Sequence, residues 1–79
     1  MIIASGGEMI LFLGGPRDGL RLLLDNLTPV IELVDGEERP RYRRWIVKLD
    51  GEQFVVYVFD GLNRAEAFKR LLRHYFVRR

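Results

Sequence analysis

The chain has 79 residues with a formal net charge of +2, is 48% hydrophobic, and contains one histidine and no cysteine. This composition excludes disulfides, thiolate metal sites and histidine-rich metal sites, and no run reaches the roughly 18 apolar residues of a membrane span. A single domain of this size buries only about 60–65% of its unfolded surface, so we expect oligomerisation or docking onto a partner to add stability.

Residues 1–7 form the start of the chain and contain Ser5-Gly6-Gly7. They lack the basic start and long apolar core of a secretory signal. We therefore expect a flexible leader at 1–7 and a single small domain at 8–79. The absence of cysteine fits a reducing compartment, so we expect a cytoplasmic protein.

Four Asp-Gly pairs divide the rest of the chain, at positions 18–19, 35–36, 50–51 and 60–61. Glycine reaches positive φ at low cost and aspartate bonds to its own backbone, so the pair is a strong turn signal. The runs between the turns predict strands at 8–13, 20–24, 30–34, 41–49 and 52–59, although the leucine-rich run from 20 also suits a helix. The spacing predicts an antiparallel β-meander of four to five strands.

The segment 52–59 is apolar on both faces. One face carries Phe54, Val56 and Val58, and the other carries Val55, Tyr57 and Phe59. Such a strand is typical of the centre of a sheet that is covered on both sides. One helix covers one face, and the other face then needs sheet curvature, a second sheet layer or a second protein chain.

The last predicted element is a helix at 64–77. Asn63 suits its N-cap, and Glu66 three residues later completes a capping-box pattern. Its predicted apolar stripe consists of Ala65, Phe68, Leu71, Leu72, Tyr75 and Phe76. The predicted fold class is therefore α+β, with the meander followed by one C-terminal helix packed on the sheet.

Few residues in the chain suit catalysis. Ser5 lies in the predicted leader, Thr28 precedes a proline, and neither has an evident base beside it. His74 lies between basic residues with no obvious carboxylate partner for general-base chemistry. The acidic clusters at 35–38 and 50–52 do not follow a calcium-loop pattern. We therefore expect no enzyme, no catalytic residues, no metal and no cofactor.

The segment Gly14–Gly19, with the sequence GGPRDG, invites comparison with phosphate-binding loops. Backbone N–H groups of glycine-rich loops cradle phosphate, and Arg17 would add a favourable charge. The segment matches neither G-x-x-x-x-G-K-[ST] nor G-x-G-x-x-G, and Pro16 lacks an N–H donor. It is therefore predicted to be a structural turn between the first two strands.

Charge is distributed unevenly along the chain. Residues 1–38 carry two arginines against seven acidic residues, a net −5, and residues 39–79 carry eleven basic residues against four acidic ones, a net +7. Arginines interleaved with Tyr42 and Trp45 are typical of nucleic-acid surfaces, while the doubly apolar fifth strand favours protein association. The predicted partner-binding residues are Arg41, Arg43, Arg44, Trp45, Tyr57, Lys69, Arg70 and Arg73.

Residues 11–19, LFLGGPRDG, resemble a pattern found in short, largely uncharacterised proteins of bacteriophages and of bacteria that carry phage-derived genes. In that pattern an apolar strand precedes Gly-Gly-Pro-x-Asp-Gly. The resemblance implies a small β-rich domain in the host cell cytoplasm and brings no established activity.

Together, the residues and the resemblance predict a non-enzymatic interaction module, a phage or mobile-element accessory protein. It is expected to form a homo-oligomer or to bind a host or virion protein. The alternative is a nucleic-acid-binding protein that uses the basic strand at 39–48 and the basic C-terminal helix. Neither a membrane nor a small-molecule substrate is expected as a partner.

Overall fold

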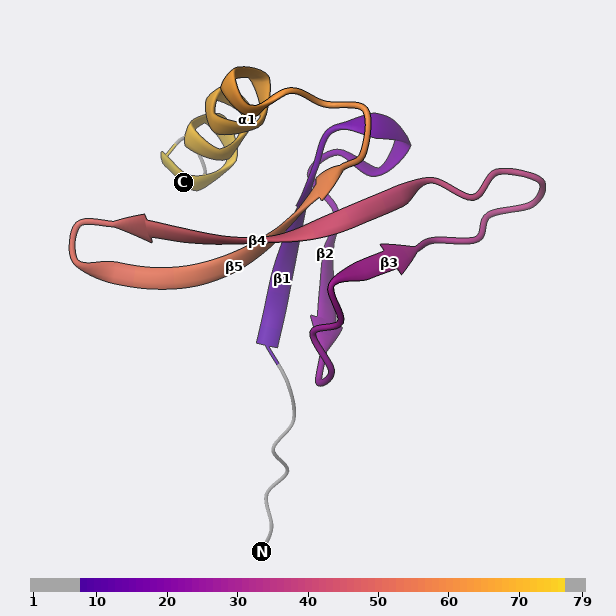
Figure 1. Ribbon diagram of the computed structural model, residues 1–79, viewed down its shortest axis with the longest axis horizontal. Helices are drawn as coiled ribbons and strands as arrows, with labels where there is room; N and C mark the ends of the chain where they lie inside the picture. Colours follow the sequence, from indigo (N-terminus) through magenta and orange to yellow (C-terminus); the bar gives the residue numbers. More distant parts are fainter. Residues whose placement is uncertain (1–7, 77–79) are drawn as a thin grey trace, which may run out of the picture.

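A computed structural model describes residues 8–76 as a curled five-stranded sheet with one helix (Figure 1). The elements are β1 (Glu8–Leu13), the 3-10 helix η1 (Gly15–Arg17), β2 (Arg21–Leu24), β3 (Val30–Glu32), β4 (Arg41–Leu49), β5 (Glu52–Phe59) and α1 (Arg64–Phe76). The α+β class is confirmed, and the second and third strands are shorter than predicted. The predicted leader and the end of the predicted helix at residue 77 lie outside the described residues.

The sheet is mixed, so the prediction of a purely antiparallel meander is wrong. Its strand order is β2-β1-β5-β4-β3. β5 pairs antiparallel with β4 and parallel with β1, where the ladder begins at Leu11 and Val56. A strand that is apolar on both faces buries most surface at the centre of a sheet. β1, whose last four residues are buried, pairs with the edge of β5 that β4 leaves open. β2 and β3 therefore lie at opposite edges of the sheet.

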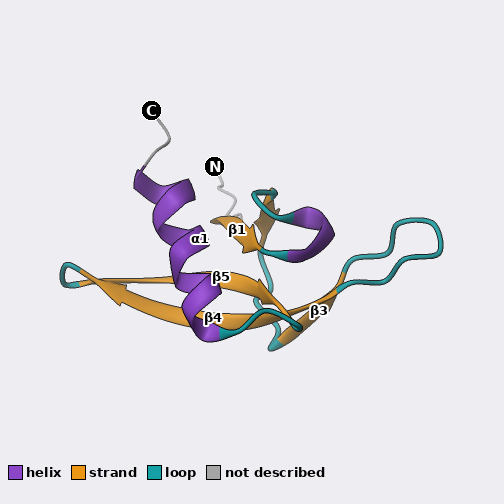
Figure 2. Ribbon diagram, turned by 90° about the horizontal axis from the view of Figure 1, so that it is seen from above, coloured by secondary structure: helices purple, strands orange, loops and turns teal. Residues whose placement is uncertain are grey.

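Each face of the sheet carries its own core. On the helix side, Leu11, Leu13, Val56 and Val58 pack with Ala67 and Leu71 of α1. On the other side, Ile10, Phe12, Tyr42 and Tyr57 are enclosed by half-buried leucines from β2 and from the segment 27–33. Seen from above, the start of α1 crosses over β4 and β5, and the rest of the helix extends beyond them (Figure 2). Of the three ways to cover the second face of β5, sheet curvature is the one this fold uses.

The helix begins as predicted but turns a different side to the sheet. The N–H of Glu66 donates to Oδ1 of Asn63 at 2.8 Å, so the predicted N-cap is confirmed. Ala67 and Leu71 are buried, whereas Phe68 of the predicted stripe is 48% exposed. Ala67 faces the sheet, and its small side chain suits a close approach of the helix. The apolar periodicity of the sequence did not place Ala67 on the buried side.

Glycine is required where β1 ends. Gly14 and Gly15 have φ of +83° and +65°. A Cβ atom at Gly14 would lie 2.6 Å from the Leu62 side chain, and one at Gly15 would lie 2.5 Å from the Phe59 ring. The glycines therefore let the loop after β1 pack directly against the connection between β5 and α1.

Candidate functional site

The basic strand β4 does not present its side chains on one surface. Because side chains alternate along a strand, Arg41, Arg43 and Trp45 lie on the helix side, while Arg44 lies on the opposite side. Trp45 is half-buried against the core, and the Arg64 guanidinium lies 5.7 Å from its ring centre. The predicted contact residues of this strand are thus divided between two faces.

Several of these predicted contact residues have partners inside the protein. Arg43 forms an ion pair with Asp60 at 2.7 Å. Arg44 and Tyr57 both donate to backbone carbonyls of the segment 25–29, each at 2.5 Å. Tyr57 is fully buried, and burial raises its pKa above the ordinary value for tyrosine. Its side chain therefore has no exposed surface with which to contact a partner.

On α1, the predicted contact residues Lys69 and Arg73 are exposed, whereas Arg70 turns toward the loop after β1. The Asp18 carboxylate of that loop lies 3.3 Å from the Arg70 guanidinium and 3.2 Å from Nε2 of His74. Its other oxygen accepts a hydrogen bond from the N–H of Gly14 at 2.6 Å. Sequence reasoning missed this carboxylate partner of His74, because it lies 56 residues away in the chain.

The environment of Asp18 keeps its carboxylate charged. Partial burial by itself would raise the pKa, but the hydrogen bonds with Gly14 and His74 and the charge of Arg70 outweigh it. The pKa of Asp18 therefore lies below its ordinary value of 3.8. At neutral pH the carboxylate ties the loop after β1 to the last turns of α1.

The pair of Asp18 and His74 lacks the nucleophile that acyl-transfer chemistry requires. Within residues 8–76 the one aliphatic hydroxyl belongs to Thr28, and it donates to the carbonyl of Val30 at 2.9 Å. Arg70 shares the same carboxylate oxygen as His74. This arrangement is suited to holding the helix on the loop. Across the described part of the chain, no three histidine or acidic side chains gather as a metal site.

The loop Gly14–Gly19 uses its polar backbone groups internally. Four of its five N–H groups donate to acceptors within the protein, at Gly14, Arg17, Asp18 and Gly19. The Arg17 side chain pairs with Asp35. A phosphate cradle needs free N–H groups that converge on one point, so this geometry favours the predicted structural turn.

Tyr42 connects this loop to the core. Its hydroxyl donates to the carbonyl of Gly14 at 2.7 Å and accepts from the N–H of Arg17 at 3.0 Å. Its ring is fully buried and lies edge-on to Phe12, with ring centres 5.1 Å apart. Burial raises the pKa of Tyr42 above its ordinary value. The hydroxyl therefore stays protonated at neutral pH and can both donate and accept.

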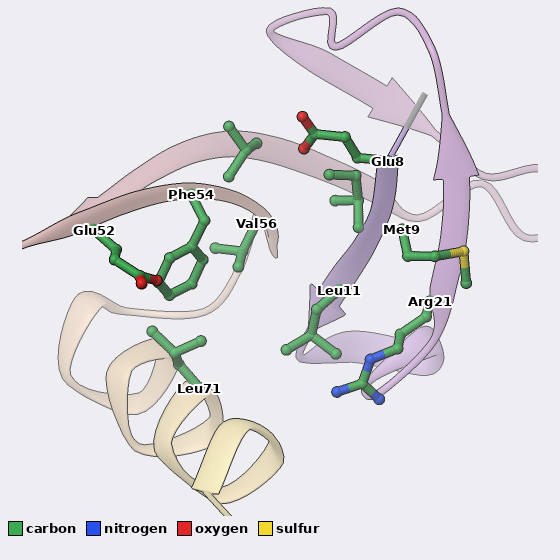
Figure 3. A pocket seen from close by; sticks show the side chains of 10 residues that line it. Glu8, Met9, Leu11, Arg21, Glu52, Phe54, Val56 and Leu71 are labelled. Atoms are coloured by element: carbon green, nitrogen blue, oxygen red, sulfur yellow. The ribbon is translucent and has the colours of Figure 1, made fainter. Parts of the chain in front are cut away.

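A pocket of about 330 Å³ lies between β1, β5 and α1 (Figure 3). It opens beside the start of the ladder between β1 and β5 at Leu11 and Val56. Its apolar lining comes from Met9, Ile10, Leu11, Phe54, Val55, Val56 and Leu71, and its charged residues are Glu8, Arg21 and Glu52. Figure 3 shows Glu52 and Arg21 on opposite sides of this pocket.

An exposed apolar pair flanks the pocket. Met9 and Leu23 are cross-strand partners in β1 and β2, and the two residues are 61% and 64% exposed. They share the face of Leu11, since side chains alternate along each strand. We call the pocket and this pair the apolar edge surface. Sequence reasoning missed this surface, and the signal that could have found it is the run Leu22-Leu23-Leu24, in which alternation along a strand turns one leucine away from its neighbours.

No family model matches the chain, and comparison with curated proteins and with solved structures finds no similar protein. No helix within residues 8–76 is long and apolar enough to cross a membrane.

Proposed function

We propose that this protein is a small, non-enzymatic interaction module that binds a protein through the apolar edge surface. The observation that carries the proposal is the pocket beside the exposed pair of Met9 and Leu23. An exposed apolar patch with a charged rim is typical of a site of protein contact. With the resemblance of residues 11–19, this favours a phage or mobile-element accessory protein that acts in the host cytoplasm on a host protein, a virion protein or its own copies.

Nucleic acid is the less favoured partner. Sequence-tolerant binding of single strands combines phosphate contacts with exposed rings on which bases stack. The rings of Tyr42 and Tyr57 are fully buried, and the ring of Trp45 is half-buried beside Arg64. The basic strand therefore has arginines that could contact phosphates, but it offers little exposed ring surface on which bases could stack.

Selection from a displayed library of random peptides tests the proposal. The full chain is immobilised at low density, so that its copies do not meet, and Leu23→Glu serves as the surface variant. Ile46→Glu is the matched control, because Ile46 is 59% exposed and lies on the opposite face of the sheet. We expect enriched peptides that bind the wild type and the control but not Leu23→Glu.

Peptides that bind all three proteins equally, or a library that yields no binder, would contradict the proposal. A parallel titration with single-stranded DNA and RNA at low salt tests the alternative. Salt-dependent binding that survives Leu23→Glu and is lost in Arg41→Glu would favour nucleic acid instead. Near-UV circular dichroism of each variant shows that the fold is retained.

A further inference from the structure

We infer that the protein partner of the apolar edge surface is a second copy of this chain, arranged as a two-fold dimer. This inference rests on the proposed function and adds the identity of the partner. Closed two-fold dimers are the commonest soluble oligomers, and their interfaces bring the same patch of both copies together. Such a patch must be complementary to itself in shape and in charge.

The shape of the surface meets the first requirement. A projecting side chain, Leu23 on β2, lies on one side of β1, and the pocket between β1 and β5 lies on the other side. A two-fold axis that passes close to β1 exchanges these two features. Leu23 of each copy then faces the pocket of the other copy, and Met9 of one copy lies near Met9 of the other.

The charges meet the second requirement. Arg21 lies on β2 next to Leu23 in space, and Glu52 lies across the pocket at the start of β5 (Figure 3). Among the described residues neither side chain takes part in an ion pair. The same two-fold operation that places Leu23 against the pocket brings Arg21 of one copy to the pocket of the other, whose acidic residues are Glu52 and Glu8, twice in each dimer.

The small size of the chain is a physical reason for it to dimerise. A domain of 79 residues without disulfides has a small core. Covering Met9, Leu23 and the pocket removes apolar surface from water without any change in the fold. Oligomerisation is one of the few ways in which such a small domain gains stability.

Sedimentation equilibrium of the full chain over a range of concentrations tests the inference. We expect a reversible monomer–dimer equilibrium in which Leu23→Glu raises the dissociation constant at least about tenfold. Ile46→Glu, which alters a similarly exposed residue on the opposite face, should leave it unchanged. A wild type that remains monomeric at millimolar concentration, or a dimer that Leu23→Glu does not weaken, would overturn the inference.

Charge reversal tests the arrangement itself. Arg21→Glu places Glu against Glu52, and Glu52→Arg places Arg against Arg21, so each variant alone should dimerise several-fold more weakly. An equimolar mixture of the two variants restores both opposite-charge pairs and should form a heterodimer as strong as the wild-type dimer. A dimer without this rescue would exclude the proposed arrangement.

The outcomes separate this inference from the proposed function. A monomer that still selects peptides through Leu23 would leave the interaction module intact and remove the second copy as its partner. A monomer that selects no peptide would contradict both proposals.

Discussion

Replacing Tyr42 by phenylalanine removes one oxygen atom from the junction between the core and the loop after β1. The ring fills the same space, so its contact with Phe12 is retained. What is lost is the acceptor for the N–H of Arg17 and the donor to the carbonyl of Gly14. The loop then has two polar groups without a protein partner.

The expected cost follows from the burial of these groups. A typical hydrogen bond contributes about 1 kcal/mol net, and a buried group left unsatisfied costs about 1–3 kcal/mol. Gly14 is buried and bears the full penalty at its carbonyl, whereas water reaches the partly buried N–H of Arg17. We expect Tyr42→Phe to lower the free energy of unfolding by about 2 kcal/mol, out of a total of about 4–12 kcal/mol for a chain of this length.

Urea unfolding followed by far-UV circular dichroism measures this change, and Tyr57→Phe is the matched control. Tyr57 is equally buried, but within residues 8–76 its hydroxyl makes one hydrogen bond, to the carbonyl of Thr28, so the loss of that bond should cost about 1 kcal/mol. If Tyr42→Phe costs no more than Tyr57→Phe, the two-bond role of the Tyr42 hydroxyl is refuted. A changed slope of the unfolding transition would indicate instead that the compactness of one state had altered.

Three further predictions concern the loop and the helix. Gly15→Ala combines a positive φ with a clash against Phe59, so it should lower the free energy of unfolding by more than about 1 kcal/mol in urea titrations; a neutral effect would contradict the required close packing. Because the pKa of Asp18 is lowered in the folded state, its contribution to stability is present above about pH 4 and is lost as the pH falls through the folded pKa; urea midpoints between about pH 2 and pH 5 should fall less steeply for Asp18→Asn than for the wild type. Asn63→Ala removes the N-cap of α1 and should cost about 1 kcal/mol in thermal unfolding, whereas Asn63→Asp should retain most of the stability; equal melting temperatures for the two variants would argue against the cap.

Local signals in the sequence predicted the individual elements well. The strands β1, β4 and β5 have the predicted bounds. Asp50 and Gly51 both take positive φ, at 55° and 78°, as a tight two-residue hairpin turn requires, and Asn63 caps the helix. Each of these features depends on residues within a few positions of one another. The steric and hydrogen-bonding preferences of that short stretch therefore decide the structure.

The candidate surface was less visible in the sequence. The interleaved arginine and aromatic residues of 41–49 predicted a binding surface on this strand. The fold divides these residues between two faces and pairs Arg43 and Arg44 within the protein. Leu23 belongs to a leucine-rich run that suits either a strand or a helix, and the run by itself does not show which leucine is exposed. Its exposure depends on how β2 pairs with β1 at the edge of the sheet.

The sequence by itself determined the α+β class, the central place of β5 and the turns that separate the strands, because apolar periodicity and turn chemistry act locally. Only the tertiary structure decided that β1 pairs in parallel with β5, that His74 meets Asp18, and that Leu23 flanks an open pocket. These contacts join residues far apart in the chain. They depend on which strands pair with the two edges of β5 and on where α1 packs on the sheet. The periodicity of a single segment does not specify either of these.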